Sequence, residues 1–101
     1  MGPIAARGAW QICHALADVL AIELMCGAQG LDFHLAGDGV NEHGQPVQTQ
    51  PLRAGQGTVQ TYDAVRGIVA RWQEDRVLHS DLEALGRAVR QGVFARRFES
   101  F

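Results

Sequence analysis

Residues 20–33 read LAIELMCGAQGLDF, an apolar run that the carboxylate of Glu23 interrupts. On a helical wheel at about 100° per residue, five polar side chains along residues 7–29 fall within roughly 60° of one another. They are Arg7, Gln11, His14, Asp18 and Gln29. Glu23 lies about 140° from Asp18, among aliphatic residues and away from this polar stripe. Because a buried carboxylate needs a partner, the run predicts a helix that packs against other helices.

The length of this helix points to more than one chain. It begins at Pro3, a favoured first-turn residue, and extends to about Phe33 within a helical segment 1–34. Such a helix is about 45 Å long at 1.5 Å per residue, whereas a compact domain of about 100 residues has a radius of gyration near 13 Å. We therefore predict that this long helix belongs to a multi-chain helical bundle, with a homo-oligomer as one form of it.

Composition limits the other classes of partner. The chain has 101 residues, 47% of them hydrophobic and 20% charged, which fits one soluble domain or part of one. A net charge of -2 gives no electrostatic footprint for nucleic acid. The apolar run 15–25 contains Asp18 and Glu23, so we expect neither a membrane span nor, without a preceding basic region, a signal peptide. Cys13 and Cys26 lie on different faces of one helix and cannot pair with each other, which favours the reducing cytoplasm.

The rest of the chain divides into a loop and two shorter helices. Residues 35–57 are rich in glycine and proline and form the loop, in which residues 40–47 can form a short hairpin. A helix is predicted over 58–72, with Thr58 as its N-cap, because its apolar residues recur every three or four positions.

The last predicted helix spans residues 80–91. Ser80 and Glu83 have the spacing of a capping box at its start, and Gly92 suits its C-terminal cap. The segment 93–101 has no clear pattern. No strand-like alternation competes with the helices outside the loop, so the predicted fold class is all-α.

Residues with catalytic or metal-binding chemistry are present but not in functional patterns. The four histidines are His14, His34, His43 and His79. No two of them have the spacing of metal ligands on a helix. Neither cysteine has an activating base nearby, so Cys13 and Cys26 are predicted to be core thiols. Gly55-Gln56-Gly57-Thr58 lacks the lysine and the glycine spacing of a phosphate-binding loop. The carboxylate pairs Glu74-Asp75 and Asp81/Glu83 fit a solvated connector and a first helical turn. The sequence thus predicts no catalytic, cofactor-binding or metal-binding residue.

Glu23 leaves two interpretations open. It pairs or hydrogen-bonds with a neighbouring helix, which is the simpler interpretation, or it has a role at an oligomer seam near an active site. The residues alone do not choose between them.

Seven ordered blocks of the chain resemble the C-terminal part of histidine ammonia-lyase. They are Met1-Gly2, Ala5-Ala6-Arg7, Leu20-Ala21-Ile22-Glu23-Leu24, Ala28-Gln29-Gly30-Leu31-Asp32-Phe33, Pro51-Leu52-Arg53-Ala54-Gly55-Gln56-Gly57-Thr58, Tyr62-Asp63-Ala64-Val65-Arg66 and Glu74-Asp75-Arg76-Val77-Leu78. The resemblance runs from Met1 to about Gly92, and the blocks are specific as an ordered set.

The resemblance implies a role in a helical tetramer that eliminates ammonia from histidine to give urocanate. Members of the family use a methylidene-imidazolone group made from an internal Ala-Ser-Gly, and this chain contains no Ala-Ser-Gly. We expect that group, together with the family's active-site Gln-Glu-Asp-His stretch, to lie upstream. The chain alone is then catalytically silent and holds no cofactor. Residues 34–50 are an extension of a link that is short in the family, and we expect this extension to decorate the surface rather than alter a neighbouring site.

Three hypotheses follow. The first is a C-terminal lyase segment, excised or from a split gene, whose partner is the missing upstream lyase core. The second is a free-standing helical assembly protein that kept the bundle and lost the chemistry. The third, a small enzyme centred on Glu23 or Glu74, is the weakest because no acid, base and electrophile converge.

Overall fold

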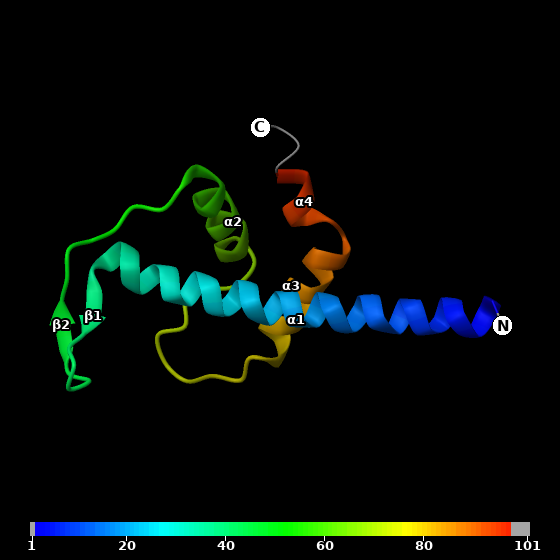
Figure 1. Cartoon of the computed structure of the whole chain (residues 1–101), viewed down its shortest axis with the longest axis horizontal. Coiled ribbons are helices and arrows are strands. Elements are labelled where there is room, and N and C mark those ends of the chain that lie inside the picture. Colours follow the sequence, from blue (N-terminus) through cyan, green and yellow to red (C-terminus); the bar gives the residue numbers. More distant parts are fainter. Residues whose placement is uncertain (1, 98–101) are drawn as a thin grey trace.

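The computed structural model describes residues 2–97, and Figure 1 shows their arrangement around one long helix. The elements in chain order are α1 (Gly2–Ala36), β1 (Asp38–Val40), β2 (Pro46–Gln48), α2 (Gln56–Arg66), α3 (His79–Arg90) and α4 (Val93–Arg97). Since helices dominate and the strands form one small two-stranded sheet, the predicted helical class is confirmed.

Helix α1 sets the elongated shape of the molecule. Its N-terminal half extends well beyond the other elements (Figure 1), and the principal extents are 57 × 33 × 22 Å. The radius of gyration is 16.9 Å, against about 13 Å for a compact domain of about 100 residues. By length and composition α1 is also apolar enough to cross a membrane. The shape agrees with a helix too long for the rest of the chain to cover.

One face of α1 forms the core with α2 and α3. Its buried residues are Ala17, Ala21, Met25, Ala28 and Asp32. Small side chains there let α3 approach closely, since a Cβ added at Gly86 would lie 3.1 Å from Oδ1 of Asp18. The central core side chains opposite α1 are Val65, Val69 and Leu85, all at most 2% exposed.

Two expectations about the faces of α1 are corrected. Gln29, predicted on the solvent-facing stripe, is partly buried: its side chain donates to the carbonyl of Trp72 at 2.8 Å and accepts from the Trp72 N–H at 3.0 Å. Cys13 and Cys26, predicted as core thiols, are free and exposed in this chain because neither lies on the face that packs against α2 and α3. The polar stripe therefore borders the buried face.

The ends of α2 and α3 also differ from the sequence prediction. Gly55, not Thr58, is the N-cap of α2, and the helix ends at Arg66 rather than residue 72, with Gly67 as its C-cap. Helix α3 begins at His79 with Leu78 as its N-cap, and no side-chain hydrogen bond caps it, so the predicted capping box at Ser80 is not formed. The N-terminal ends of α2 and α3 therefore do not depend on side-chain capping hydrogen bonds.

Gly92 follows the C-cap of α3 and fits its predicted role. The C-cap is Gln91, and Gly92 has a φ of 75°, the left-handed conformation typical of the residue after a helix. The short helix α4, for which the sequence offered no clear pattern, starts at the next residue and packs back on α2 and α3.

The predicted hairpin is confirmed inside the loop. Strands β1 and β2 pair antiparallel, with Gly39 opposite Val47. The Asn41 side chain accepts hydrogen bonds at 2.9 Å from the N–H groups of His43 and Gln45, and Gly44 has a positive φ of 75°. Within the extension 34–50, residues 34–36 complete α1 and residues 38–48 form this hairpin.

Candidate functional site

The best-formed polar cluster joins α1 to α2 around a buried carboxylate. Asp32 is 6% exposed and its Oδ2 lies 2.5 Å from Nη2 of Arg66. The Tyr62 hydroxyl donates a short hydrogen bond to Oδ1, and Nε of Arg71 lies 3.9 Å from Oδ2. A buried carboxylate with cationic and hydroxyl partners meets the requirement for burying a charge. The cluster is a buried ion pair, supported by a tyrosine hydrogen bond, that links α1 to α2.

The cluster shifts the pKa of the Tyr62 phenol. The hydrogen bond to the Asp32 carboxylate, followed by burial, raises the pKa of the Tyr62 phenol above its ordinary value of 10.0, although Arg66 opposes the shift. A phenol with a raised pKa stays protonated and donates, so Tyr62 is a hydrogen-bond donor rather than a base.

Sequence reasoning missed this cluster because it singled out the wrong carboxylate. Asp32 lies in the Leu31-Asp32-Phe33 stretch, and its partners are 30 and 34 residues further along the chain. The usable signal was that two of the blocks that carry the family resemblance contain all three side chains. Glu23 is exposed in the described part of the chain, and the prediction of its partner stays open.

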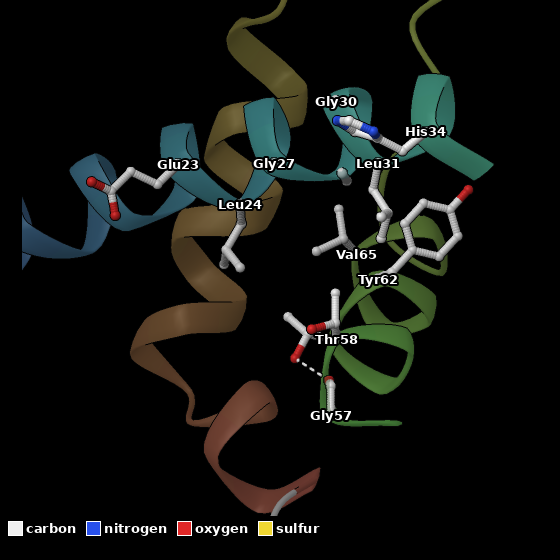
Figure 2. Close-up of a pocket in the computed structure, with 12 residues that line it drawn as sticks. Glu23, Leu24, Gly27, Gly30, Leu31, His34, Gly57, Thr58, Tyr62 and Val65 are labelled. Carbon is white, nitrogen blue, oxygen red and sulfur yellow. Dashed lines mark hydrogen bonds between the residues drawn. The ribbon is translucent and has the colours of Figure 1, made fainter. Parts of the chain in front are cut away.

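Beside the cluster, α1 and α2 enclose an open apolar groove of about 740 Å³. Figure 2 shows Leu24, Leu31 and Val65 turned toward the space between the helices, with Glu23 at one end of the groove and Tyr62 at the other. Gly27 and Gly30 form part of the α1 wall, and a Cβ at either would meet no atom within 4 Å. The groove therefore has room for side chains that the described residues 2–97 do not supply.

The remaining candidates stay apart from one another. His14 packs on Trp10 with ring centroids 3.9 Å apart, and His79 lies 3.3 Å from Glu83 at the surface. Within residues 2–97, no group of three or more His, Cys, Asp or Glu side chains could hold a metal ion. Thr58 and Gly57 line the groove rather than an anion site, and the Thr61 hydroxyl donates to the Gly57 carbonyl at 3.0 Å.

The groove and the Asp32 cluster do not fit the prosthetic group of the resembling family. A methylidene-imidazolone group forms from Ala-Ser-Gly, and the chain has only two serines. Ser80 stands between His79 and Asp81 in the first turn of α3, and Ser100 between Glu99 and Phe101. No chemical step is therefore assigned to that group in this chain.

The fold and the site define a helical segment with a buried interhelical ion pair and an open apolar groove. The chain belongs to the aromatic amino acid lyase family, whose model matches residues 1–67.

Curated relatives agree with this family over nearly the whole chain. The chain is 36% identical over 92 residues to a histidine ammonia-lyase of Alkaliphilus oremlandii, covering 91% of this chain and 15% of the relative. It is 35% identical over 99 residues to that of Natranaerobius thermophilus (98% and 17%) and 42% identical over 82 residues to that of Deinococcus radiodurans (81% and 13%). The chain thus spans about one sixth or less of the length of these relatives. No solved structure matches it.

Proposed function

We propose that this chain is a C-terminal helical segment of a histidine ammonia-lyase-like enzyme, which eliminates ammonia from L-histidine to give urocanate. The observation that carries the proposal is the match to histidine ammonia-lyases along 81–98% of the chain but only 13–17% of each relative. The segment supplies framework helices and is catalytically silent alone, because its sequence lacks Ala-Ser-Gly and because no nucleophile and base converge among residues 2–97. The methylidene-imidazolone group belongs to the missing lyase core, which is the proposed partner.

The proposed setting is the cytoplasm, with α1 packed in protein rather than in lipid. Although α1 passes a length and composition test for a membrane span, it carries Asp18, Glu23 and the buried, ion-paired Asp32. Charged groups at membrane depth are costly unless they face protein. Flotation of the purified chain with lipid vesicles tests this placement, since a cytoplasmic segment stays in the unbound fraction.

The experiment for the lyase role is complementation. The Deinococcus radiodurans enzyme, deleted of the segment that matches this chain, is mixed with the chain and histidine, and urocanate absorbance is followed. We expect no urocanate from either part alone and its appearance from the mixture. Urocanate from the chain alone, or none from the folded mixture, contradicts the proposal.

Two variants control this experiment. Asp32→Asn removes the ion pair that orients α2 on α1, and we expect it to lose complementation. Val77→Ser changes a side chain that is 83% exposed in a connector, and we expect it to complement normally.

A second candidate is a free-standing helical assembly protein of the same family. It is favoured by the row of large exposed apolar side chains on α1, such as Ile12 at 69% and Leu16 at 54% exposure. A stable homo-oligomer that never complements a lyase core supports it over the enzyme segment.

A further inference from the structure

After the hairpin the chain returns to the C-terminus of α1 before it enters α2. We name residues 48–52 the strap; it begins at the last residue of β2 and leads toward α2 (Figure 1). The last carbonyls of an α-helix have no partner within the helix and need donors from elsewhere. The strap supplies such donors to the end of α1.

Two carbonyls at the end of α1 accept hydrogen bonds from the start of the strap. Nε2 of Gln48 donates to the Ala36 carbonyl at 3.0 Å and to the Gly37 carbonyl at 3.1 Å. The Gly37 carbonyl also accepts from the N–H of Thr49 at 2.6 Å and from its hydroxyl at 2.8 Å. The strap is therefore a C-terminal cap of α1 that comes from the far side of the hairpin.

Gly37 allows the strap to lie this close to α1. It is buried and has a φ of 77°, a conformation that favours glycine. A Cβ at this position would lie 2.9 Å from Nε2 of Gln48 and would collide with the Thr49 carbonyl. A side chain at residue 37 would thus displace the strap.

The strap also limits the distance between the end of α1 and the start of α2. The N–H of Leu52 donates to the His34 carbonyl at 3.0 Å, and α2 begins at Gln56. Four residue steps can span at most about 14 Å. His34 and Gly57 both line the open groove between α1 and α2, so the strap joins its two walls.

Helix α2 is held to α1 at two places. Its second half carries Tyr62 and Arg66, which bind Asp32. Its first half, residues 57–61, lines the groove and follows the strap. Helix α4 also packs on α2, so we expect α2 to stay folded when the strap is released. Release of the strap would let the first half of α2 move while the ion pair holds the second half.

We propose that the strap is a conformational device that sets the width of the groove between α1 and α2. The hairpin that leads to the strap then shapes the groove, in place of the surface decoration expected from the sequence. The inference goes beyond the proposed function and does not depend on lyase activity.

Amide hydrogen exchange of the full chain tests the cap. In the double variant Gln48→Ala/Thr49→Val, exchange of the Leu52 N–H should become at least about tenfold faster, because side-chain hydrogen bonds that hold the strap are lost. Gly37→Ala should act in the same direction by collision. Gln50→Ala is the matched control, since Gln50 is an exposed glutamine of the same strap, and its exchange should equal that of the wild type. Unchanged exchange in the double variant overturns the proposal.

Distances between two spin labels, measured by electron paramagnetic resonance, test the width of the groove. In a Cys13→Ser background, one label is attached to Cys26 on α1 and the other to Val59→Cys in the first half of α2, and both positions are exposed. The labelled chain is diluted with unlabelled chain so that only distances within one molecule are recorded. The double variant should broaden this distance distribution by about twofold, and Gln50→Ala should leave it unchanged.

A second label pair separates movement of one end of α2 from general loosening. It joins Cys26 to Asp63→Cys, an exposed position next to Tyr62 in the half of α2 that the ion pair holds. Its distribution should stay unchanged in the double variant. Broadening of both pairs or of neither overturns the proposal, and so does loss of the helical circular dichroism, because the strap would then support the whole fold. The lyase role is judged separately by urocanate formation with the deleted enzyme, so either can fail alone.

Discussion

The two faces of α1 each carry a carboxylate, and the two carboxylates differ in burial and in hydrogen-bond partners. On the face toward α2, Asp32 is 6% exposed and has an arginine and a tyrosine hydroxyl as partners. On the opposite face, Glu23 is exposed at the end of an apolar groove. The comparison teaches that apolar character alone does not identify the buried face of a helix. The buried face is the one whose polar group finds partners within the same chain.

The largest expected effect comes from breaking the ion pair on the buried face. Asp32→Asn leaves the Arg66 guanidinium, whose side chain is 16% exposed, without its anion. Removing one partner of a buried pair typically costs about 3–5 kcal/mol. Urea unfolding followed by circular dichroism measures this cost. Asp63→Asn, an exposed change on α2, serves as control and should stay within about 0.5 kcal/mol.

Truncation of a leucine on each face compares how much the two faces contribute to stability without changing any charge. Leu85→Ala removes a side chain with 0% exposure from the core against α1, and we expect a loss of about 2–5 kcal/mol in the free energy of unfolding. Leu16→Ala on the opposite face should change it by no more than about 0.5 kcal/mol at concentrations where the chain is monomeric. Equal losses for the two variants would show that the monomer buries both faces.

Tyr62 adds a pH dependence to the buried face. Tyr62→Phe removes the hydrogen bond to the Asp32 carboxylate, and we expect a loss of about 1.5–3 kcal/mol at neutral pH. In the wild type the raised pKa means that the folded state holds the phenol proton more tightly than the unfolded state. This stabilisation is fully present below about pH 10 and is lost as the pH rises through the raised pKa.

Urea unfolding at a series of pH values checks this dependence. Tyr62 is the only tyrosine of the chain, so absorbance of the phenolate follows its titration without overlap. The wild type should lose stability in the alkaline range, and Tyr62→Phe should lose less. Parallel alkaline losses in the two proteins would assign the effect to other groups.

The smallest effect is expected at the rim between the faces. Oδ1 of Asp18 lies 3.6 Å from Nη1 of Arg90, and the Asp18 side chain is 67% exposed. Exposed ion pairs contribute at most about 1 kcal/mol and are screened by salt. A double-mutant cycle with Asp18→Asn and Arg90→Gln at low and high salt measures the coupling. A coupling free energy as large as the roughly 3–5 kcal/mol expected for Asp32→Asn would show that the Asp18–Arg90 pair is shielded from water like the buried face.

Local patterns in the sequence predicted element types better than element ends. The periodicity of residues 58–72 correctly predicts a helix, yet α2 ends at Arg66, and Val69 reaches the core from the turn that follows. Thr58 and Ser80 have the composition of N-caps, but α2 and α3 begin one or more residues earlier, without side-chain caps. Capping contributes about 1 kcal/mol, which burial of a single core side chain can override.

The candidate site was less accessible to sequence reasoning than the fold. The wheel correctly separates Glu23 from the polar stripe, but it cannot show that Arg66 and Tyr62 approach Asp32. It also assigns Gln29 to solvent, whereas the chain returns after α2 and places Trp72 against it. Both errors concern contacts between residues 30 or more positions apart in the sequence.

The sequence by itself determined the helical class, the hairpin inside the loop and the membership of the aromatic amino acid lyase family. These follow from residue periodicity, turn chemistry and ordered blocks, all of which are local along the chain. Only the tertiary structure decided which face of α1 is buried and that Asp32 is the carboxylate with partners. The physical reason is that an amphipathic helix records which residues share a face, while burial and ion pairing depend on which distant segments pack against that face.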